Sequence, residues 1–415
     1  MHYKQKYIYV GLDLHKNTHT AVIINCWNEK LGEIRIENKP SAFQQLIDEV
    51  NRHAIDLEPV YGLEDTGGFG RSLAVFLLEK GQTVKEVNSA LSHAERKSYP
   101  TTQKSDSWDA FCIANVLLAK MNTLPNANPQ DLYWTLGQLV GRRNAIVKAS
   151  GTLANQLHDR LGHHYPSYRK FFCDVDGKAA LAFWEEYPSP HLLENVTENE
   201  LAEFLRNASR NSCSTRKAKQ ILDLVGKDGD TNREYQKIRD FIVMSIVRDI
   251  RFKKQELEKV EKELEKAIKL LGYKLETMPG INTVTACSLV SQIGDIRRFP
   301  NADKLARFAG IAPINFSSAG KGKDQKSKQG NRGLHGTFYF LAVQQVQTVK
   351  GTKEPRNPAF YEYYQRKVAE GKTKMQALVC VMRRLVNIIY GMMKNKTEYI
   401  MPQMPQKELP LKEAV

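Results

Sequence analysis

Four acidic residues stand where a carboxylate is costly unless something compensates its charge. Asp13 interrupts an apolar run and Glu64 ends another, while Asp106 and Asp109 lie three residues apart at a predicted helix start. At that spacing, Asp106 and Asp109 project from one face of the helix. Carboxylates gathered at one place repel each other unless cations lie between them. Oxygen ligands at that density select Mg²⁺ or Mn²⁺, and two such ions about 4 Å apart can stabilise attack and departure at phosphorus.

Each acid also has an ordinary structural explanation. Asp13 would suit a hairpin turn, Asp106 an N-cap, and Asp109 the first turn of a helix, where it meets the helix dipole. Asp65 is an alternative to Glu64, although it points to the opposite face of an extended strand. The metal-site interpretation therefore depends on whether the fold brings the four acids together.

The elements predicted around the acids follow a definite order. Apolar runs and alternating stretches predict five strands, at residues 7–14, 20–24, 32–38, 59–64 and 83–87. Helices are predicted from residue 40, around residues 73–78 and at about 107–121, the last one after a polar loop rich in Lys, Arg, Ser and Thr. This order is that of an α/β ribonuclease-H-like (RuvC-like) domain, which we assign to residues 1–125. In that topology Asp13, Glu64, Asp106 and Asp109 converge.

Residues 126–275 are predicted to form a long helical and coiled-coil region. Residues 136–161 have the pattern of a long amphipathic helix. Further on, apolar residues recur every seventh position, at Ile250, Leu257, Leu264 and Leu271. Such a repeat is typical of a coiled-coil seam, and the lysines and glutamates of residues 253–269 would occupy its exposed faces. A zipper between subunits and a helical hairpin within one chain fit this pattern equally well.

The remaining chain, residues 276–398, is predicted to be a mostly α-helical domain, followed by a disordered tail at 399–415. The Pro279-Gly280 turn feeds a helix and resembles the turn of helix-hairpin-helix modules, whose helix N-terminus attracts phosphate. An ordinary helix connection is the alternative. Residues 314–336 are predicted to be a loop that cannot form a core. Its five cations, opposed by one acid, are Lys321, Lys323, Lys326, Lys328 and Arg332.

Composition narrows the class of protein. The 415 residues carry 61 Lys and Arg against 46 Asp and Glu, a net charge of +15, which predicts a polyanionic partner. No apolar run approaches the length of a bilayer span, and the N-terminus lacks the pattern of a signal peptide. The six cysteines show neither a CxxC motif nor a pairing rhythm, so we expect reduced thiols, no structural zinc and a cytoplasmic location.

Motifs in both halves resemble those of one family. The N-terminal motifs are Gly11-Leu12-Asp13, Leu63-Glu64-Asp65-Thr66-Gly67 and Lys104-Ser105-Asp106-Ser107-Trp108-Asp109-Ala110. The C-terminal motifs include Met278-Pro279-Gly280-Ile281, Gly310-Ile311-Ala312-Pro313, Ser317-Ser318-Ala319-Gly320 and Lys328-Gln329-Gly330-Asn331-Arg332. Together they resemble the DEDD-type insertion-sequence transposases, relatives of the Piv DNA invertase, some of which are bridge-RNA-guided serine recombinases. The resemblance covers most of the chain.

This resemblance implies a serine nucleophile in addition to Mg²⁺ (or Mn²⁺) held by the four acids. The family's serine precedes a glycine directly, and the matching residue is Ser318, here separated from Gly320 by Ala319. That departure leaves Ser317 as an alternative. A neutral hydroxyl is a weak nucleophile and needs a nearby base or metal. A second departure is Leu334-His335-Gly336, where relatives carry arginines.

The predicted function is that of an insertion-sequence transposase or site-specific recombinase, which cuts and rejoins donor and target DNA through the serine. The resemblance also implies an element-encoded bridge RNA, a homo-oligomer of two to four copies, and the nucleoid of a prokaryotic cell. Lys104 and Gly280 join the five cations as predicted nucleic-acid contacts. Two alternatives are a RuvC-like nuclease or resolvase that uses water, and a non-catalytic nucleic-acid-binding scaffold.

Overall fold

The computed structural model describes most of the chain and divides it into two compact units, Met1–Asp131 and Leu132–Val415. The described residues are 2–65, 67–100, 104–129, 132–209, 211, 214–318, 321–325 and 330–402, and between 314 and 325 the description is of the backbone. The expected disordered tail lies outside this range from residue 403 on, and so do Lys326 and Lys328. The two units are described separately.

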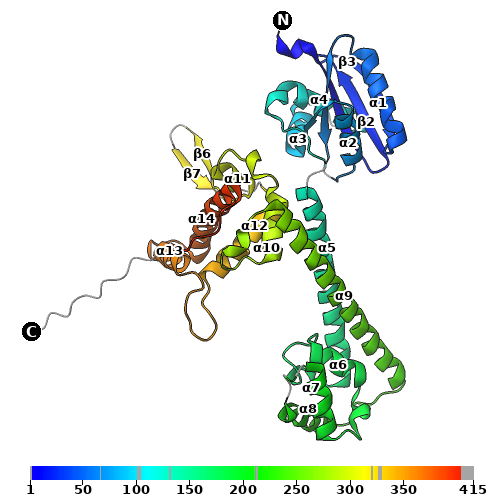
Figure 1. The fold of residues 1–415 in the computed structure, drawn as a ribbon, viewed down its shortest axis with the longest axis vertical. Coiled ribbons are helices and arrows are strands. Elements are labelled where there is room, and N and C mark those ends of the chain that lie inside the picture. The colour runs from blue at the N-terminus through cyan, green and yellow to red at the C-terminus, as the bar shows by residue number, and fades with distance from the viewer. Residues whose placement is uncertain are drawn as a thin grey trace, which may run out of the picture. The chain divides into compact units, whose positions relative to one another are not determined.

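The first unit is built on one five-stranded mixed sheet (Figure 1). Its strands are β1 (Tyr7–Leu14), β2 (Thr18–Ile24), β3 (Lys30–Glu37), β4 (Glu58–Glu64) and β5 (Thr83–Glu86). They lie in the order β3-β2-β1-β4-β5, with β1, β2 and β3 antiparallel and β4 parallel to both β1 and β5. The five predicted strands are therefore all present, and the α/β character of the N-terminal region is confirmed.

Helices cover both faces of this sheet. They are α1 (Pro40–His53), α2 (Arg71–Glu79), α3 (Ser89–Ser98) and α4 (Asp106–Lys120). The side chains of α1 and α2 share one apolar core with residues such as Val10 and Leu12 of β1. The other face carries Tyr9 and Val22, which pack against the buried side of α4. The sheet is consequently buried on both faces. Polar residues are therefore expected at the ends of its strands.

Helix α3 corrects the sequence prediction, which placed a loop between β5 and α4. Asn88 caps the helix by accepting a hydrogen bond from the backbone N–H of Ala90 at 2.8 Å. Its buried residue is a serine, Ser92, so the segment lacks the apolar periodicity that reveals most helices. The N-cap and packing against α4 stabilise this helix instead.

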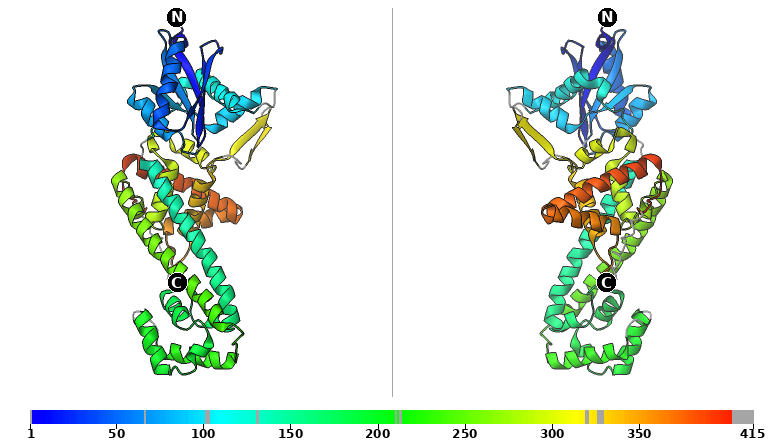
Figure 2. Two further views of the ribbon diagram at one scale, coloured as in Figure 1. Left: turned by 90° about the vertical axis from the view of Figure 1, so that its right-hand side faces the viewer. Right: turned by 90° about the vertical axis from the view of Figure 1, so that its left-hand side faces the viewer.

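The second unit is organised around two long helices, α5 (Leu132–His164) and α9 (Gln236–Leu271), which lie side by side (Figures 1 and 2). Leu264 and Ile268 of α9 share a core with Leu136 of α5. An ion pair of 2.9 Å joins Arg143 to Glu261 across the pair. Of the two arrangements that fit the heptad pattern, the structure has the helical hairpin within one chain.

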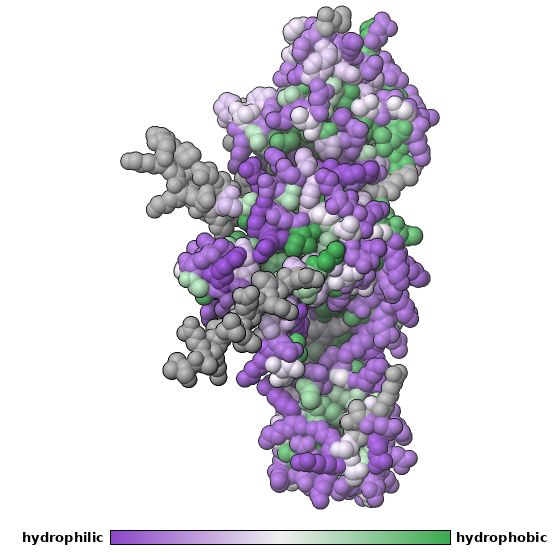
Figure 3. Space-filling view, turned by 60° about the vertical axis from the view of Figure 1, so that its left-hand side comes forward, coloured by the Kyte–Doolittle hydropathy of each residue, from purple (hydrophilic) through white to green (hydrophobic). Residues whose placement is uncertain are grey.

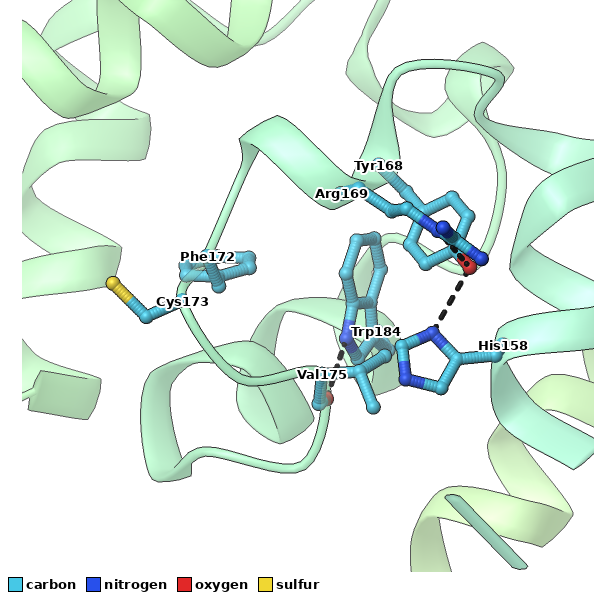
Figure 4. Close-up of a pocket in the computed structure, with 7 residues that line it drawn as sticks. All are labelled: His158, Tyr168, Arg169, Phe172, Cys173, Val175 and Trp184. Carbon is cyan, nitrogen blue, oxygen red and sulfur yellow. Dashed lines mark hydrogen bonds between the residues drawn. The ribbon is translucent and has the colours of Figure 1, made fainter. Parts of the chain in front are cut away.

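The segment between α5 and α9 folds into a small helical lobe of α6 (Lys178–Glu186), α7 (Glu198–Ser209) and α8 (Thr215–Asp228). A crevice of about 380 Å³ lies in this lobe (Figure 4). The Tyr168 hydroxyl lies 2.9 Å from Nδ1 of His158, and the Trp184 indole N–H donates to the carbonyl of Val175 at 3.0 Å. Trp184 has no exposed surface. Because these polar groups already bond one another, we regard the crevice as part of the lobe's aromatic core.

Residues 272–402 form the rest of the second unit. Its elements are α10 (Thr283–Ile293), α11 (Ala302–Phe308), β6 (Ile314–Ser318), β7 (Lys321–Gln325), α12 (Arg332–Val346), α13 (Pro358–Ala369) and α14 (Lys374–Asn395). Short 3₁₀ turns also occur in both units, at Tyr3–Lys6, Met121–Thr123, Tyr168–Lys170, Pro190–Leu193, Leu275–Thr277 and Ile296–Arg298. The mostly helical character predicted for this part of the chain is confirmed.

The prediction of a loop at residues 314–336 was wrong in two respects. Strands β6 and β7 pair as an antiparallel hairpin, and α12 already begins at Arg332. Leu334 is fully buried, and the Asn331 side chain caps the helix by accepting from the Leu334 N–H at 2.9 Å. A two-stranded ladder satisfies backbone groups without apolar side chains, so composition alone does not reveal it.

The described residues contain no helix that is long and apolar enough to cross a membrane. On the face drawn in Figure 3, hydrophilic residues predominate and hydrophobic ones form smaller groups.

Gly11 lets α4 lie directly on β1, and its replacement by alanine tests that contact. A Cβ there would lie 2.2 Å from the carbonyl oxygen of Ala110 and 2.3 Å from the backbone nitrogen of Ala114. We expect Gly11→Ala to reduce the stability of the first unit by roughly 2–3 kcal/mol, because helix and strand must separate. Urea unfolding read by hydrogen exchange of β1 and α4 peptides measures this.

The matched control is Gly141→Ala on α5, where an added Cβ meets no atom within 4 Å. Alanine is the better helix former there, so stability should stay the same or rise by up to about 1 kcal/mol. Equal stability of both variants would show that β1 and α4 are not held at the distance described.

Candidate active site

The ends of β1 and β4 place two of the predicted acids next to each other. Asp13 pairs in register with Glu64 across the parallel strands β1 and β4, and both lie at the carboxyl ends of their strands. Neighbouring strands are about 4.8 Å apart, so the two side chains leave the same face at close range. The loss of regular pairing beyond these residues leaves space there for a ligand.

Helix α4 brings the other two acids to the same place. Ser105 caps the helix by accepting from the Trp108 N–H at 3.1 Å, and its first turn contains Asp106 and Asp109. Because α4 contacts β1 at Gly11 through Ala110 and Ala114, the first turn of the helix reaches the end of the strand, where Asp106 shares the partner His15 with Asp13. Three elements therefore meet at the four predicted acids.

His15 lies between two of these acids, and the sequence prediction did not include it. Its Nε2 is 3.1 Å from Oδ2 of Asp13 and 3.4 Å from Oδ1 of Asp106. Ligand atoms of the three residues all lie within 4.8 Å of one another. The alternation of side chains along a strand gives residues 13 and 15 the same side. That spacing was a usable signal, but His15 lies between the predicted strands 7–14 and 20–24 and was not considered as a ligand.

Helix α3 supplies partners for the other two acids. The Ser92 hydroxyl donates a hydrogen bond to Oε2 of Glu64. One turn later the Arg96 guanidinium forms an ion pair of 2.9 Å with Oδ1 of Asp109. Residues four apart share one face of a helix, so α3 presents both groups to the site together. These contacts could not be predicted because the helix itself was missed.

The electrostatics of Asp13 reflect the crowding. Burial raises the pKa of its carboxyl, the charges of Asp109, Asp106 and Glu64 raise it further, and His15 opposes them. Oδ2 of Asp13 has almost no exposed surface and makes no hydrogen bond. Burial lowers the pKa of Arg96, but the hydrogen bond and charge of Asp109, together with Glu64, raise it above its ordinary value.

The donor set fits a hard divalent cation. Four carboxylates supply oxygen ligands, and the buried Oδ2 of Asp13 has Nε2 of His15 beside it at 3.1 Å but no hydrogen bond of good geometry. The Oδ2 of Asp65 accepts a hydrogen bond from the Gly70 N–H at 3.1 Å. Asp13, Glu64, Asp106 and Asp109 remain the predicted ligands, and ligand atoms of Asp13 and Asp106, together with His15, lie within 4.8 Å of one another.

The remaining predicted site residues are spread over both units. Lys104 is exposed, two residues before Asp106. Gly280 has φ +84°, and an added Cβ would lie 2.9 Å from Nε2 of Gln345. That same nitrogen donates a hydrogen bond to the carbonyl of Pro279. Gly280 is thus required by the shape of its turn, whatever the turn binds.

Ser318 is the last residue of β6 and pairs across the hairpin with Lys321, while Ser317 pairs with Gly322. Lys323 lies further along β7, opposite Phe316, and Arg332 is the first residue of α12. The structure gathers the four acids in the first unit and places both serines in the second.

Two family models match this chain. Residues 10–166 match the DEDD transposase model of the IS110 type, described as "Transposase", and residues 272–365 match the one described as "Transposase IS116/IS110/IS902 family". The first match includes all four acids, and the second includes both serines.

Curated relatives align along almost the whole chain. A 44.8 kDa protein of insertion element IS116 from Streptomyces clavuligerus is 24% identical, over 94% of this chain and 95% of its own length. A 42 kDa protein of insertion element IS900 from Mycobacterium paratuberculosis is also 24% identical, over 94% and 97%. The pilin gene-inverting protein of Moraxella bovis is 23% identical over the same shares. The chain therefore belongs to the IS110 family of insertion-element transposases, and it is a DNA transposase or recombinase.

Proposed function

We propose that this enzyme cuts DNA at the ends of an insertion element by joining a strand to Ser318, and that Asp13, Glu64, Asp106 and Asp109 hold the Mg²⁺ or Mn²⁺ ions that assist. The observation that supports the metal site most is the meeting of these acids, since Asp13 pairs in register with Glu64 and shares the partner His15 with Asp106. Such crowding is costly unless a cation relieves it. The family membership supports DNA as the substrate.

When bound, the cations would neutralise charge on the scissile phosphate and lower the barrier to attack. The chain's own groups prepare the site. Glu64 and Asp109 are held in place by Ser92 and Arg96 of α3. His15, which bridges Asp13 and Asp106, holds these two carboxylates and would move aside or remain as an additional ligand when the ions bind. The serine ester conserves the phosphodiester energy, so that the strand can be rejoined to a new partner.

The distribution of charge supports a division of labour. Residues 1–131 carry 14 Lys and Arg against 16 Asp and Glu, whereas residues 272–402 carry 21 against 8. The positive surplus of the chain therefore lies mostly in residues 272–402. This region includes the β6–β7 hairpin, which carries Ser317 and Ser318 and is called the serine hairpin, and the helices that follow it. We assign the grip on the DNA backbone to this region, including Lys321, Lys323, Lys326, Lys328 and Arg332, and metal-assisted chemistry to residues 1–125.

Further parts of the proposal concern partners. Each chain contributes one matching serine, whereas exchanging strands requires several cuts that are held together, so two to four copies would act at once. The helical region 126–275 would separate the two chemical parts, and the domain of residues 276–398 would carry the serine. An element-encoded bridge RNA would select the donor and target sites. The enzyme would act in the nucleoid of a prokaryotic cell.

One observation favours an alternative, a metal-dependent nuclease that uses water. The acid site is assembled within the first unit alone, from β1, β4, α3 and α4, and needs no residue of the second unit for its contacts. In that case Ser318 would serve only the hairpin. The covalent intermediate described below distinguishes the two functions.

Asp13→Asn tests the metal site in two ways. Mg²⁺-dependent cleavage should fall at least a hundredfold, because a ligand is lost. The pKa of Asp13 in the fold is raised, so the metal-free fold loses stability as the pH rises through it. An uncharged Asn removes that loss, and the metal-free variant should melt above the wild type at pH 8. Thermal unfolding with and without Mn²⁺ should show a metal-induced rise in the wild type only.

Asp56→Asn is the control, since Asp56 is exposed and has a left-handed φ of 57° that asparagine tolerates. It should leave both readouts unchanged. If Asp13→Asn kept its cleavage activity and its stabilisation by Mn²⁺, the four acids would not be the metal site.

Lys321→Gln and Lys323→Gln test the grip on the DNA backbone. Each should flatten the log–log salt dependence of DNA binding by roughly one unit, because one phosphate contact and its released counterion are lost. The preference among sequences should not change. Fluorescence anisotropy between 50 and 300 mM KCl measures both, with the exposed Lys6→Gln as the control. A changed sequence preference at constant slope would contradict the assignment.

Ser318→Ala tests the nucleophile. Wild-type enzyme incubated with Mg²⁺, labelled element-end DNA and the element's RNA should give a labelled protein band on a denaturing gel. Ser318→Ala should abolish this band, whereas Ser317→Ala should at most weaken it. The opposite pattern would move the nucleophile to Ser317. Efficient cleavage by the double variant without any adduct would establish the water-dependent nuclease instead.

A further inference from the structure

The N-terminal half of α9, which lies nearest the helical lobe (Figure 1), exposes several large apolar side chains. Ile238 is 61% exposed, Phe241 57%, Ile242 39% and Phe252 54%. Single exposed apolar side chains are common, but several large ones together on one helix indicate a binding surface. We call the surface formed by Ile238, Phe241, Ile242, Arg248, Phe252 and Lys253 the α9 strip.

The strip lies on the side of α9 that faces away from the core. Val243, Val247 and Ile250 of the same helix segment are fully buried against the lobe and α5. At 100° per residue, Phe241 and Phe252 project from the opposite side of the helix, less than one residue's turn apart. The two rings therefore point the same way, separated by about 16 Å along the helix. Both rings keep more than half of their surface exposed.

Each ring of the strip is accompanied by a cation. Cζ of Arg248 lies 5.6 Å from the centre of the Phe241 ring, and Nζ of Lys253 lies 5.5 Å from that of Phe252. These are cation–π distances. In the described part of the chain, neither cation forms an ion pair within 4 Å of an acid, although the charge of Lys253 contributes to lowering the pKa of Glu256.

This charge argues against a second copy of the chain as the occupant. A seam along the strip would follow residues 238, 241, 245, 248 and 252, a spacing that puts Ser245 and Arg248 among the central positions. Pairing two such helices would bury a guanidinium from each, at a considerable desolvation cost. An occupant with flat apolar faces and negative charge would satisfy rings and cations together.

We propose that the α9 strip binds unpaired nucleotides of a nucleic-acid strand, whose bases stack on Phe241 and Phe252 and whose phosphates contact Arg248 and Lys253. Single-strand-binding surfaces combine aromatic stacking and backbone charge in this way. The strip is separate from the four acids and from Ser318, and its function does not require them. The ligand comes from DNA or from RNA, and both present the same chemistry.

The experiment measures binding of labelled 20-nucleotide strands to the full-length protein in EDTA, so that neither the metal site nor cleavage contributes. Phe241→Ser/Phe252→Ser should weaken binding of a single strand roughly ten- to a hundredfold and leave the salt slope unchanged. Arg248→Gln/Lys253→Gln should flatten that slope by about 1.4 units, since each contact on a single strand contributes about 0.7. Binding is measured separately with single-stranded RNA, single-stranded DNA and duplex DNA. The strand whose affinity falls most in these variants identifies the natural ligand.

Leu270→Ser is the matched control, because Leu270 is 77% exposed on the same helix but lies beyond the strip. It should bind all strands like the wild type. The substituted side chains are exposed, except that of Lys253, which is half-buried, and thermal unfolding checks that each variant keeps its fold. Unchanged single-strand binding by the phenylalanine variant would overturn the proposal. A lower mass in light scattering together with unchanged binding would instead identify the strip as a contact between copies.

Discussion

The mutual repulsion of four carboxylates at one end of a sheet is the constraint on which the first unit depends. The register of β1 and β4 sets Asp13 beside Glu64, and the contact of α4 with Gly11 adds Asp106 and Asp109. Without compensation, this arrangement would push the strand ends and the helix apart. The surrounding structure opposes that tendency by packing α4 closely and by placing cationic or hydrogen-bonding groups on the acids. We propose that a divalent ion relieves this repulsion when it binds.

The groups that restrain the acids come from places where polar residues are usually interpreted as solvent-exposed. His15 follows the last residue of β1, and Arg96 belongs to a short polar helix with one buried serine. Both carry or can carry positive charge, and both contact carboxylates of the predicted metal site. Their positions suggest an order of events in which a cation replaces protein charges that are already present. The fold can therefore form before the ion arrives, in contrast to small domains that fold only around their metal.

The second unit has a different physical character, since its charge suits the binding of a polyanion. Its C-terminal part carries most of the positive surplus of the chain, and the serine hairpin extends from it as a two-stranded ribbon with lysines on its second strand. Charges of that density would weaken a carboxylate–metal centre if they shared its core, and a net acidic first unit avoids the conflict. The long pair α5 and α9 connects this C-terminal part to the helical lobe of α6–α8 through apolar packing at both ends. On the remaining outer side of α9, aromatic rings and cations alternate on a surface without a partner in the described chain.

Sequence alone determined the five strands, their order and the four acids, because alternation of apolar residues and isolated buried charges are local signals. It also determined the family, through motifs such as Gly11-Leu12-Asp13 and Ser317-Ser318-Ala319-Gly320. It could not reveal α3, β6–β7 or the role of His15, since polar segments owe their structure to neighbours that are distant in the chain. Asn88 and Ser92 become a helix only against α4, and Ile314–Gln325 becomes a hairpin through backbone pairing that no side-chain pattern encodes. The heptads of α9 fit a zipper between subunits and a helical hairpin within one chain equally well, because both arrangements bury the same residues. Only the tertiary structure shows that these residues pack against the apolar face of α5 in the same chain.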